Sequence, residues 1–317
     1  MYPAYLQSYK EGKLKKTAQQ LSDRLKSCDL CPRKCGVNRL EGEEGFCKTA
    51  LKAKIYSFMA HHGEEPPVSG VNGSGTIFFS GCNMRCVYCQ NHCFSQGGEG
   101  REIARQELAE IMLKLQDASC HNINLVTPTH VLPQILKALE IAVEEGLKIP
   151  LVYNTGGYEA SETIKMLEGI VDIYLPDMRY ADNQAALKYS AAPEYPSYNR
   201  QAVKEMHRQA GNAQINDKGI ISRGMIIRHL VLPNNISGTD KIMRFVADNI
   251  SRESYISLMS QYHPCFTAKE FPELSHRLSA QEYREAQEIM EKYGLHNGWS
   301  QDSGGMESYL GTRIKAL

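Results

Sequence analysis

The 317-residue chain lacks a long hydrophobic run and an excess of charge of either sign, and Trp299 is its single tryptophan. Residues 1–20 contain no apolar segment behind a basic start, so we expect neither a secretion signal nor a membrane span. Lys plus Arg and Asp plus Glu number 36 each, for a formal net charge of +0. This balance removes any general attraction to nucleic acid or an anionic membrane. We therefore expect a cytoplasmic protein with no nucleic-acid and no membrane partner.

Cysteine is plentiful by contrast, with ten residues, seven of which fall into two tight clusters. Disulfide scaffolds spread their cysteines through small secreted chains, so this clustering indicates metal sites in a reducing compartment. In residues 81–91, Gly-Cys-Asn-Met-Arg-Cys-Val-Tyr-Cys-Gln-Asn, three and then two residues separate Cys82, Cys86 and Cys89. A loop this short can direct three thiolates to three irons of a [4Fe–4S] cluster. The fourth iron stays open to a substrate or cofactor, as in other catalytic metal sites.

Alternating strand and helix patterns surround this cysteine loop. The apolar run at residues 75–80 predicts a buried strand directly before it. Five further strands are expected at 123–128, 151–154, 171–175, 225–232 and 255–260, with helices at 103–118, 131–145, 161–168, 183–210, 240–250 and 280–293. Repeated β–α units predict a parallel sheet with right-handed crossovers. The pattern alone fits a closed eight-unit barrel, an open six-unit barrel or a doubly wound sheet.

The cysteine spacing, with Tyr88 directly before the third cysteine, resembles the signature of the radical S-adenosylmethionine (SAM) superfamily. The resemblance implies a partial (β/α)6 barrel in which SAM chelates the open iron. One electron from the reduced cluster would cleave SAM to methionine and a 5′-deoxyadenosyl radical, which abstracts a hydrogen from the substrate. It also implies a low-potential reductant such as flavodoxin or ferredoxin. A structural zinc site or unrelated buried cysteines are the alternatives.

The loops after the second and third strands hold candidate SAM contacts, because strand ends line the functional face of a barrel. Thr127 stands where many members of the family have the acid of a Gly-Gly-Glu-Pro motif that contacts the SAM amino group. Its hydroxyl could accept a hydrogen bond, although without charge. Asn154, Thr155 and Gly156 stand where the family contacts SAM ribose or carboxylate, and an ordinary turn is the alternative. With Tyr88, these residues are our candidate cofactor contacts.

The fourth and fifth strands add charged candidates. Asp177 and Arg179 occupy the place of an Asp-Leu-Lys motif in glycyl-radical activating enzymes, and we expect both to contact SAM or the substrate. Asp177 could instead cap the following helix. Arg228 and His229 resemble an Arg-His pair in the same enzymes, but neighbours on a strand point to opposite faces. We expect His229 to face the site, which makes His229 and Asp177 the candidate catalytic residues.

A second cysteine cluster comprises Cys28, Cys31, Cys35 and Cys47. Four crowded thiolates repel one another unless a cation compensates, so this segment predicts a second metal site. The spacing fits a structural zinc ion or an auxiliary iron–sulfur cluster, and we prefer zinc. Unmetallated thiols are a third possibility.

Three segments are expected on this basis: an N-terminal helical extension with the four cysteines at 1–74, a radical SAM core barrel at 75–270, and a C-terminal helix and tail at 271–317. His61, His62, Glu64 and Glu65 lie in the loop before the first barrel strand. These four could bind a metal or a polar substrate, but we expect a solvated, charge-rich loop.

The N-terminal cysteines, the Glu-Glu-Pro-Pro segment and the strand at 75–80 together resemble an uncharacterised branch related to pyruvate formate-lyase activating enzyme. This resemblance implies hydrogen abstraction from a glycine of a partner protein, because we find no glycyl-radical domain in this chain. Modification of a small metabolite is the alternative within the same chemistry. A non-catalytic iron–sulfur or zinc protein is the alternative from a different class.

Overall fold

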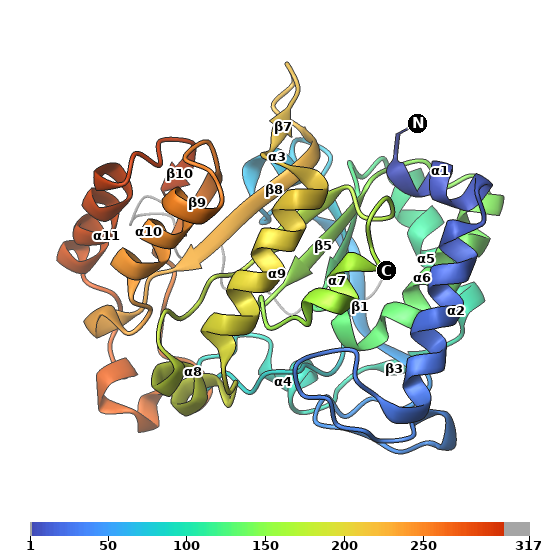
Figure 1. The fold of residues 1–317 in the computed structure, drawn as a ribbon, viewed down its shortest axis with the longest axis horizontal. Coiled ribbons are helices and arrows are strands. Elements are labelled where there is room, and N and C mark those ends of the chain that lie inside the picture. Colours follow the sequence, from blue (N-terminus) through green and yellow to red (C-terminus); the bar gives the residue numbers. More distant parts are fainter. Residues whose placement is uncertain (1, 301–317) are drawn as a thin grey trace.

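A mixed sheet with parallel central strands organises residues 2–300, the part of the chain that the computed structural model describes (Figure 1). The strand order is β10-β9-β8-β6-β5-β4-β2-β1-β3, and β7 pairs with β8 outside this path. The strands are β1 Ala53–His61, β2 Ser74–Phe79, β3 Arg101–Ile103, β4 Ile123–Val126, β5 Leu151–Thr155, β6 Ile173–Pro176, β7 Gln214–Ile215, β8 Ile221–Leu230, β9 Tyr255–Met259 and β10 Gly298–Ser300.

The six strands expected from the sequence are β2, β4, β5, β6, β8 and β9, and neighbours in this series pair in parallel. At one edge β1 runs antiparallel to β2 and β3 antiparallel to β1, while β10 adds in parallel to β9 at the other. The path through the described strands ends at β3 and β10, so the sheet is open. The expected α/β fold with six β–α units is confirmed.

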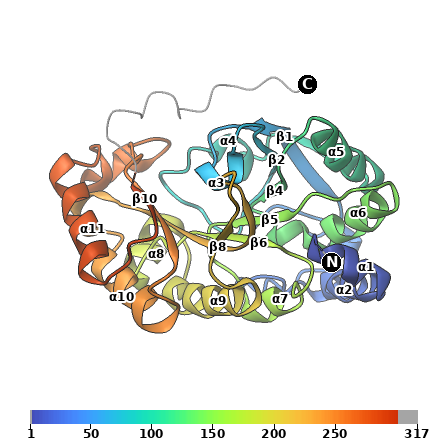
Figure 2. The same cartoon turned by 90° about the horizontal axis from the view of Figure 1, so that it is seen from above.

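Helices cover the outside of this sheet in an arc (Figure 2). The arc contains α5 Arg105–Asp117, α6 Leu132–Glu144, α7 Ser161–Lys165, α9 Tyr195–Ala210, α10 Thr239–Asn249 and α11 Ala280–Lys292, with α8 Asn183–Ser190 directly before α9. Two short helices, α3 Pro66–Ser69 and α4 His92–Ser95, lie on the other side of the sheet. Within residues 2–300, every helix is too short or too polar to span a lipid bilayer.

Alternation along the strands separates the helix-covered face from the interior. Tyr153 and Ile227 belong to the main core against the outer helices, while Val152 and Ile226 pack with Val68 of α3. This smaller apolar cluster closes the amino end of the interior. Interior positions nearer the carboxyl ends of the strands are polar, and the cysteine loop follows β2 at that end.

The N-terminal helices α1 Ala4–Lys10 and α2 Lys13–Asp23 pack beside α6 (Figure 2). Leu14 and Leu21 of α2 are fully buried, and the Tyr5 hydroxyl donates to the Ile149 carbonyl at 2.7 Å. β1 lies before the boundary expected at residue 74 and β10 after the one expected at residue 270, yet both belong to the same sheet. Residues 301–317 of the expected C-terminal tail lie outside the described residues.

Candidate active site

The loop after β2 carries Cys82, Cys86 and Cys89 at the carboxyl end of the parallel strands. Gly81 begins this loop with φ +87°, and a Cβ there would lie 2.4 Å from the Cys47 carbonyl oxygen. Glycine is therefore required where the loop passes the N-terminal cysteine segment. The Arg85 amide donates to the Ser190 carbonyl at 2.9 Å, which anchors the loop to the end of α8.

Two donors converge on the sulfur of Cys86. Arg179 Nη1 lies 3.3 Å from it and Ser190 Oγ 3.0 Å. Burial raises the pKa of the Cys82 thiol to about 12, and neighbouring Cys86 adds to the effect. Thiols in such surroundings lose their protons when a metal binds, because the cation replaces the lost solvation. The donor set therefore fits an anionic iron–sulfur cluster.

No three His, Cys, Asp or Glu side chains within residues 2–300 are arranged to hold a metal ion as they stand. Cys82, Cys86 and Cys89 are candidate cluster ligands because of their spacing in the sequence. Cys93, the nearest further cysteine, is partly exposed just beyond the loop.

A chain of ion pairs leads from Cys86 into the interior of the barrel. Arg179 Nη2 lies 2.6 Å from one oxygen of Asp177, and Arg228 Nε lies 2.8 Å from the other. Arg228 continues to Glu64 at 3.1 Å and donates to Asn154 Oδ1 at 2.7 Å. We call Glu64, Asn124, Asn154, Asp177, Arg179 and Arg228 the interior polar network, since Glu64 also accepts from both asparagines.

The network is balanced in charge, with two guanidinium groups and two carboxylates. The Arg179 side chain is 25% exposed and that of Arg228 14%. Arg179 is thus the more accessible cation, and it also contacts the cysteine loop. Gly156 faces the same region, because a Cβ there would lie 3.2 Å from Met84 Sδ and 3.8 Å from the Arg179 guanidinium.

The structure brings Asn154, Gly156, Asp177 and Arg179 together as expected. The alternative that Asp177 caps the next helix is wrong, because Asp182 caps α8 by accepting from the amides of residues 184 and 185. Asp177 is free for its two arginine partners.

His229 does not face this site, and the expectation that it does is wrong. Its Nδ1 lies 2.7 Å from the Met178 carbonyl and its Nε2 3.0 Å from Thr239 Oγ1, on the side of α10. Burial lowers its pKa to about 4, so the ring is neutral and holds the strand against the helix. Arg228, the neighbour that strand alternation turns the other way, occupies the interior position instead.

Three other candidates lie outside the interior polar network. The Thr155 side chain points to the outer face of the sheet, where its hydroxyl donates to the Glu159 carboxylate. The Tyr88 ring is buried, and its hydroxyl contacts that of Tyr180, which lies 2.7 Å from Ser190 Oγ.

Thr127 lies at the end of β4 with φ +56°, a conformation that is rare for a β-branched residue. Such strain is concentrated at functional sites.

Glu64 and Glu65 are interior residues, so the expectation of a solvated loop is wrong for them. Glu65 is buried, and its carboxylate accepts from Trp299 Nε1 of β10 at 2.7 Å. Burial, reinforced by the charge of Glu64, raises the pKa of Glu65 to about 7. Pro66 starts α3 immediately afterwards. His62, by contrast, is exposed.

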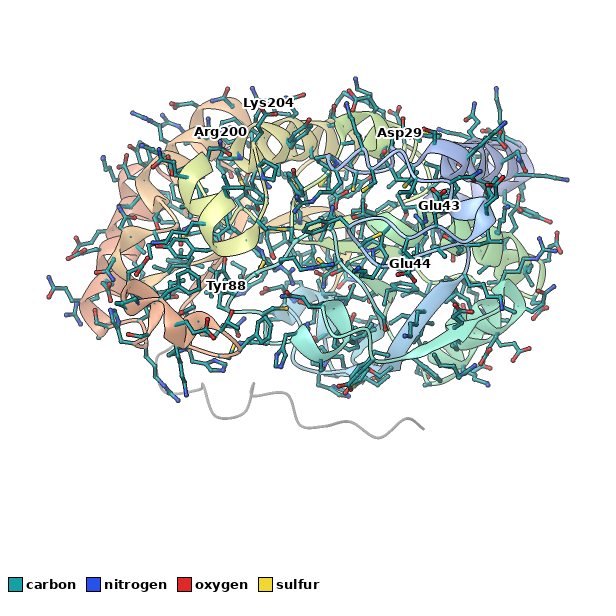
Figure 3. The ribbon with its side chains drawn as sticks, turned by 90° about the horizontal axis from the view of Figure 1, so that it is seen from below. Asp29, Glu43, Glu44, Tyr88, Arg200 and Lys204 are labelled. Carbon is teal, nitrogen blue, oxygen red and sulfur yellow. The ribbon has the colours of Figure 1, made fainter. Side chains whose placement is uncertain are left out.

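The N-terminal cysteines line a small cavity of about 10 Å³ together with Arg39 and His130. Cys28, Cys31 and Cys47 are buried, whereas Cys35 is exposed. No pattern in the sequence indicated a role for Arg39, a fully buried cation that donates to the carbonyls of Ala50 and His130. Figure 3 shows Glu43 and Glu44 of this segment and Tyr88 of the cysteine loop in one view of the molecule.

Comparison with known proteins identifies the family. Residues 76–246, more than half of the chain, match the model of the radical SAM superfamily. The chain is 36% identical over 281 residues to the uncharacterized protein MJ0674 of Methanocaldococcus jannaschii, covering 85% of this chain and 76% of that protein. It is 26% identical over 276 residues to the uncharacterized protein MJ0808 of the same organism, covering 80% and 75%.

A crystal structure of HydG, a maturase of the [FeFe]-hydrogenase, superimposes with a TM-score of 0.48 at 11% identity, covering 98% of this chain and 69% of that one. The family match and the 36% identical relative carry the assignment. This chain therefore belongs to the radical SAM superfamily, whose members use a [4Fe–4S] cluster and SAM.

Proposed function

We propose that Cys82, Cys86 and Cys89 hold the [4Fe–4S] cluster and that the interior polar network positions SAM and the substrate beneath it. The observation that carries this proposal is the unbroken chain of contacts from Cys86 through Arg179 and Asp177 to Arg228. When bound, the cluster and SAM supply a 5′-deoxyadenosyl radical that abstracts a hydrogen from the substrate.

The side chains around Cys86 have a defined electrostatic role. Hydrogen bonds from Arg179 and Ser190 stabilise negative charge on its sulfur. Donors to cluster sulfurs and nearby positive charge also raise the reduction potential of the cluster. Arg179 can in addition pair with a carboxylate, while Asp177 and the Asn154 amide oxygen can accept from an ammonium group. The network thus offers both signs of charge to a zwitterionic ligand.

The finer function we infer is activation of a glycine in a separate protein, as in the branch related to pyruvate formate-lyase activating enzyme. The Asp177–Arg179 motif and the inward-facing Arg228 support this inference. A low-potential flavodoxin or ferredoxin would be the reductant, and the cytoplasm the location. A small charged metabolite is the second candidate substrate, since the network is partly buried and α3 with Val68 closes the interior below it.

We further propose that the N-terminal cysteine segment holds a second metal, either zinc or an auxiliary iron–sulfur cluster. Three buried thiols that line one cavity with a fully buried guanidinium support this proposal. A bound metal ion would compensate the charge of the thiolates, which otherwise repel one another.

Anaerobic reconstitution followed by dithionite and SAM tests the enzyme assignment. We expect 5′-deoxyadenosine from the wild-type chain and none from Cys86→Ala, because the cluster loses a ligand. Cys93→Ala is the matched control, which should retain product formation. Undiminished 5′-deoxyadenosine from Cys86→Ala would refute the ligand assignment. Failure of the fully loaded wild type to form any would favour a non-catalytic iron–sulfur or zinc protein.

A further inference from the structure

His130 is a buried histidine outside the interior polar network. It lies in the 3-10 helix Thr129–Val131 after β4 and is 2% exposed. Its Nε2 lies 2.8 Å from the Ser80 carbonyl oxygen. A carbonyl oxygen only accepts, so Nε2 carries the hydrogen and Nδ1 keeps a lone pair. Within residues 2–300, Nδ1 is buried without a hydrogen-bond partner.

An orphaned acceptor of this kind requires an explanation, because buried polar atoms in folded proteins are nearly always satisfied. Histidines that bind metals characteristically donate their other ring N–H to a carbonyl or carboxylate, which fixes the tautomer and the ring. The bond from His130 to Ser80 has this form. Its free nitrogen is therefore prepared to act as a ligand.

His130 lines the same cavity as the N-terminal cysteines. Arg39 joins the two sides of this cavity, since its Nη1 donates to the His130 carbonyl at 2.8 Å and lies 3.9 Å from Cys28 Sγ. Five side chains that can bind metals thus line one small space, one more than a tetrahedral metal ion takes, and four of them would draw closer together on binding an ion.

Exposure distinguishes among the five. Cys28, Cys31 and Cys47 are buried, and Cys35 is exposed, with its sulfur accepting from the Phe46 amide at 3.5 Å. Cations also line this cavity, namely Arg33, Lys34 and Arg39. Three thiolates and a neutral imidazole around Zn²⁺ carry one negative charge, which these cations compensate.

We propose that Cys28, Cys31, Cys47 and His130 Nδ1 bind a single zinc ion, with Cys35 outside its coordination sphere. This inference builds on the second metal proposed above, and selects both the metal and the ligands. It also links the two cysteine clusters, because His130 is bonded to Ser80, two residues before Cys82. The zinc site would then stabilise the end of β2, where the cysteine loop with Cys82, Cys86 and Cys89 begins.

Zinc content and zinc K-edge X-ray absorption of the anaerobically purified full chain test the ligand set, since iron elsewhere does not contribute to this edge. We expect one zinc per chain with three sulfur ligands and one imidazole nitrogen. Cys35→Ser should leave both the zinc content and this coordination unchanged. His130→Ala should lose the nitrogen contribution or the zinc itself. Cys35→Ser remains informative if His130→Ala fails to fold.

Four sulfur ligands in the wild type, with one lost in Cys35→Ser, would overturn the role of His130. Absence of zinc, or iron in its place, would overturn the zinc site itself. Neither result changes the expected formation of 5′-deoxyadenosine, which depends on the cluster at Cys82, Cys86 and Cys89. The zinc site and the radical SAM assignment can therefore fail separately.

Discussion

At the scale of single residues, Arg228 decides the character of the barrel interior. It contacts Asp177, Glu64 and Asn154, which come from three different parts of the chain. Strand periodicity predicted that one member of the Arg228–His229 pair would point inward. The register of β8 against β6 and β9 determines which one does. Since Arg228 satisfies two carboxylates at once, its loss leaves both without their shared cation.

We expect Arg228→Met to reduce the free energy of unfolding by about 3–5 kcal/mol, because it leaves uncompensated buried charge. Anaerobic urea denaturation of the wild type and the variant measures this difference. Arg101→Met removes an exposed ion pair to Glu107, in which the arginine side chain is 67% exposed, and should cost no more than about 1 kcal/mol. Equal losses in the two variants would show that the interior pair contributes no more than a surface one.

At the scale of elements, the last two residues of β5, directly before the turn, point to opposite sides of the sheet. Asn154 joins the interior polar network, while Thr155 reaches Glu159 on the outside. Glu159 is buried and accepts from Thr129 at 2.6 Å and Tyr153 at 3.2 Å, which ties β4 to β5. The turn requires Gly157, where φ is +77° and a Cβ would lie 2.1 Å from the Asp177 carbonyl oxygen.

Burial raises the pKa of Glu159 to about 7 from an ordinary value of 4.5. The folded protein therefore holds a proton that the unfolded chain releases, and this contribution to stability is lost as pH rises through about 7. Between pH 5 and pH 8 we expect the wild type to lose about 1–3 kcal/mol more stability than Glu159→Gln. Urea denaturation across this pH range measures the difference. Parallel pH dependence in the two proteins would contradict the shifted pKa.

At the scale of the whole molecule, the N-terminal extension is attached to the barrel by specific contacts. Asp172, which directly precedes β6, accepts from the Ala4 amide at 2.8 Å and the Leu151 amide at 3.1 Å. Ser8 of α1 donates to the Gly169 carbonyl at 2.6 Å. These contacts hold the helices that lead into the N-terminal cysteine segment against the outside of the sheet.

Replacement of Asp172 by alanine removes two hydrogen bonds from a buried site. We expect a loss of about 1–3 kcal/mol and faster amide exchange in α1, measured by hydrogen–deuterium exchange. Asp182→Ala, which removes the cap of α8, should cost about 1 kcal/mol and leave exchange in α1 unchanged. Unaltered protection of α1 in Asp172→Ala would show that the extension is held by its apolar contacts alone.

By itself the sequence determined the family signature, the six β–α units and the strand ends at which polar side chains gather. These follow from the spacing of Cys82, Cys86 and Cys89 and from hydrophobic periodicity, which are properties of short stretches of chain. Asn154, Asp177 and Arg179 were predictable because parallel strands bring their carboxyl ends to one face.

Tertiary structure alone decided which partners meet inside. The choice of Arg228 over His229, the interior position of Glu64 and the free nitrogen of His130 all depend on contacts between distant segments. Glu64 and Arg228 are separated by 164 positions, Arg39 and His130 by 91, and Ser80 and His130 by 50. Local patterns carry no information about such pairs, because strand order, register and helix docking bring them together only once the whole sheet has formed.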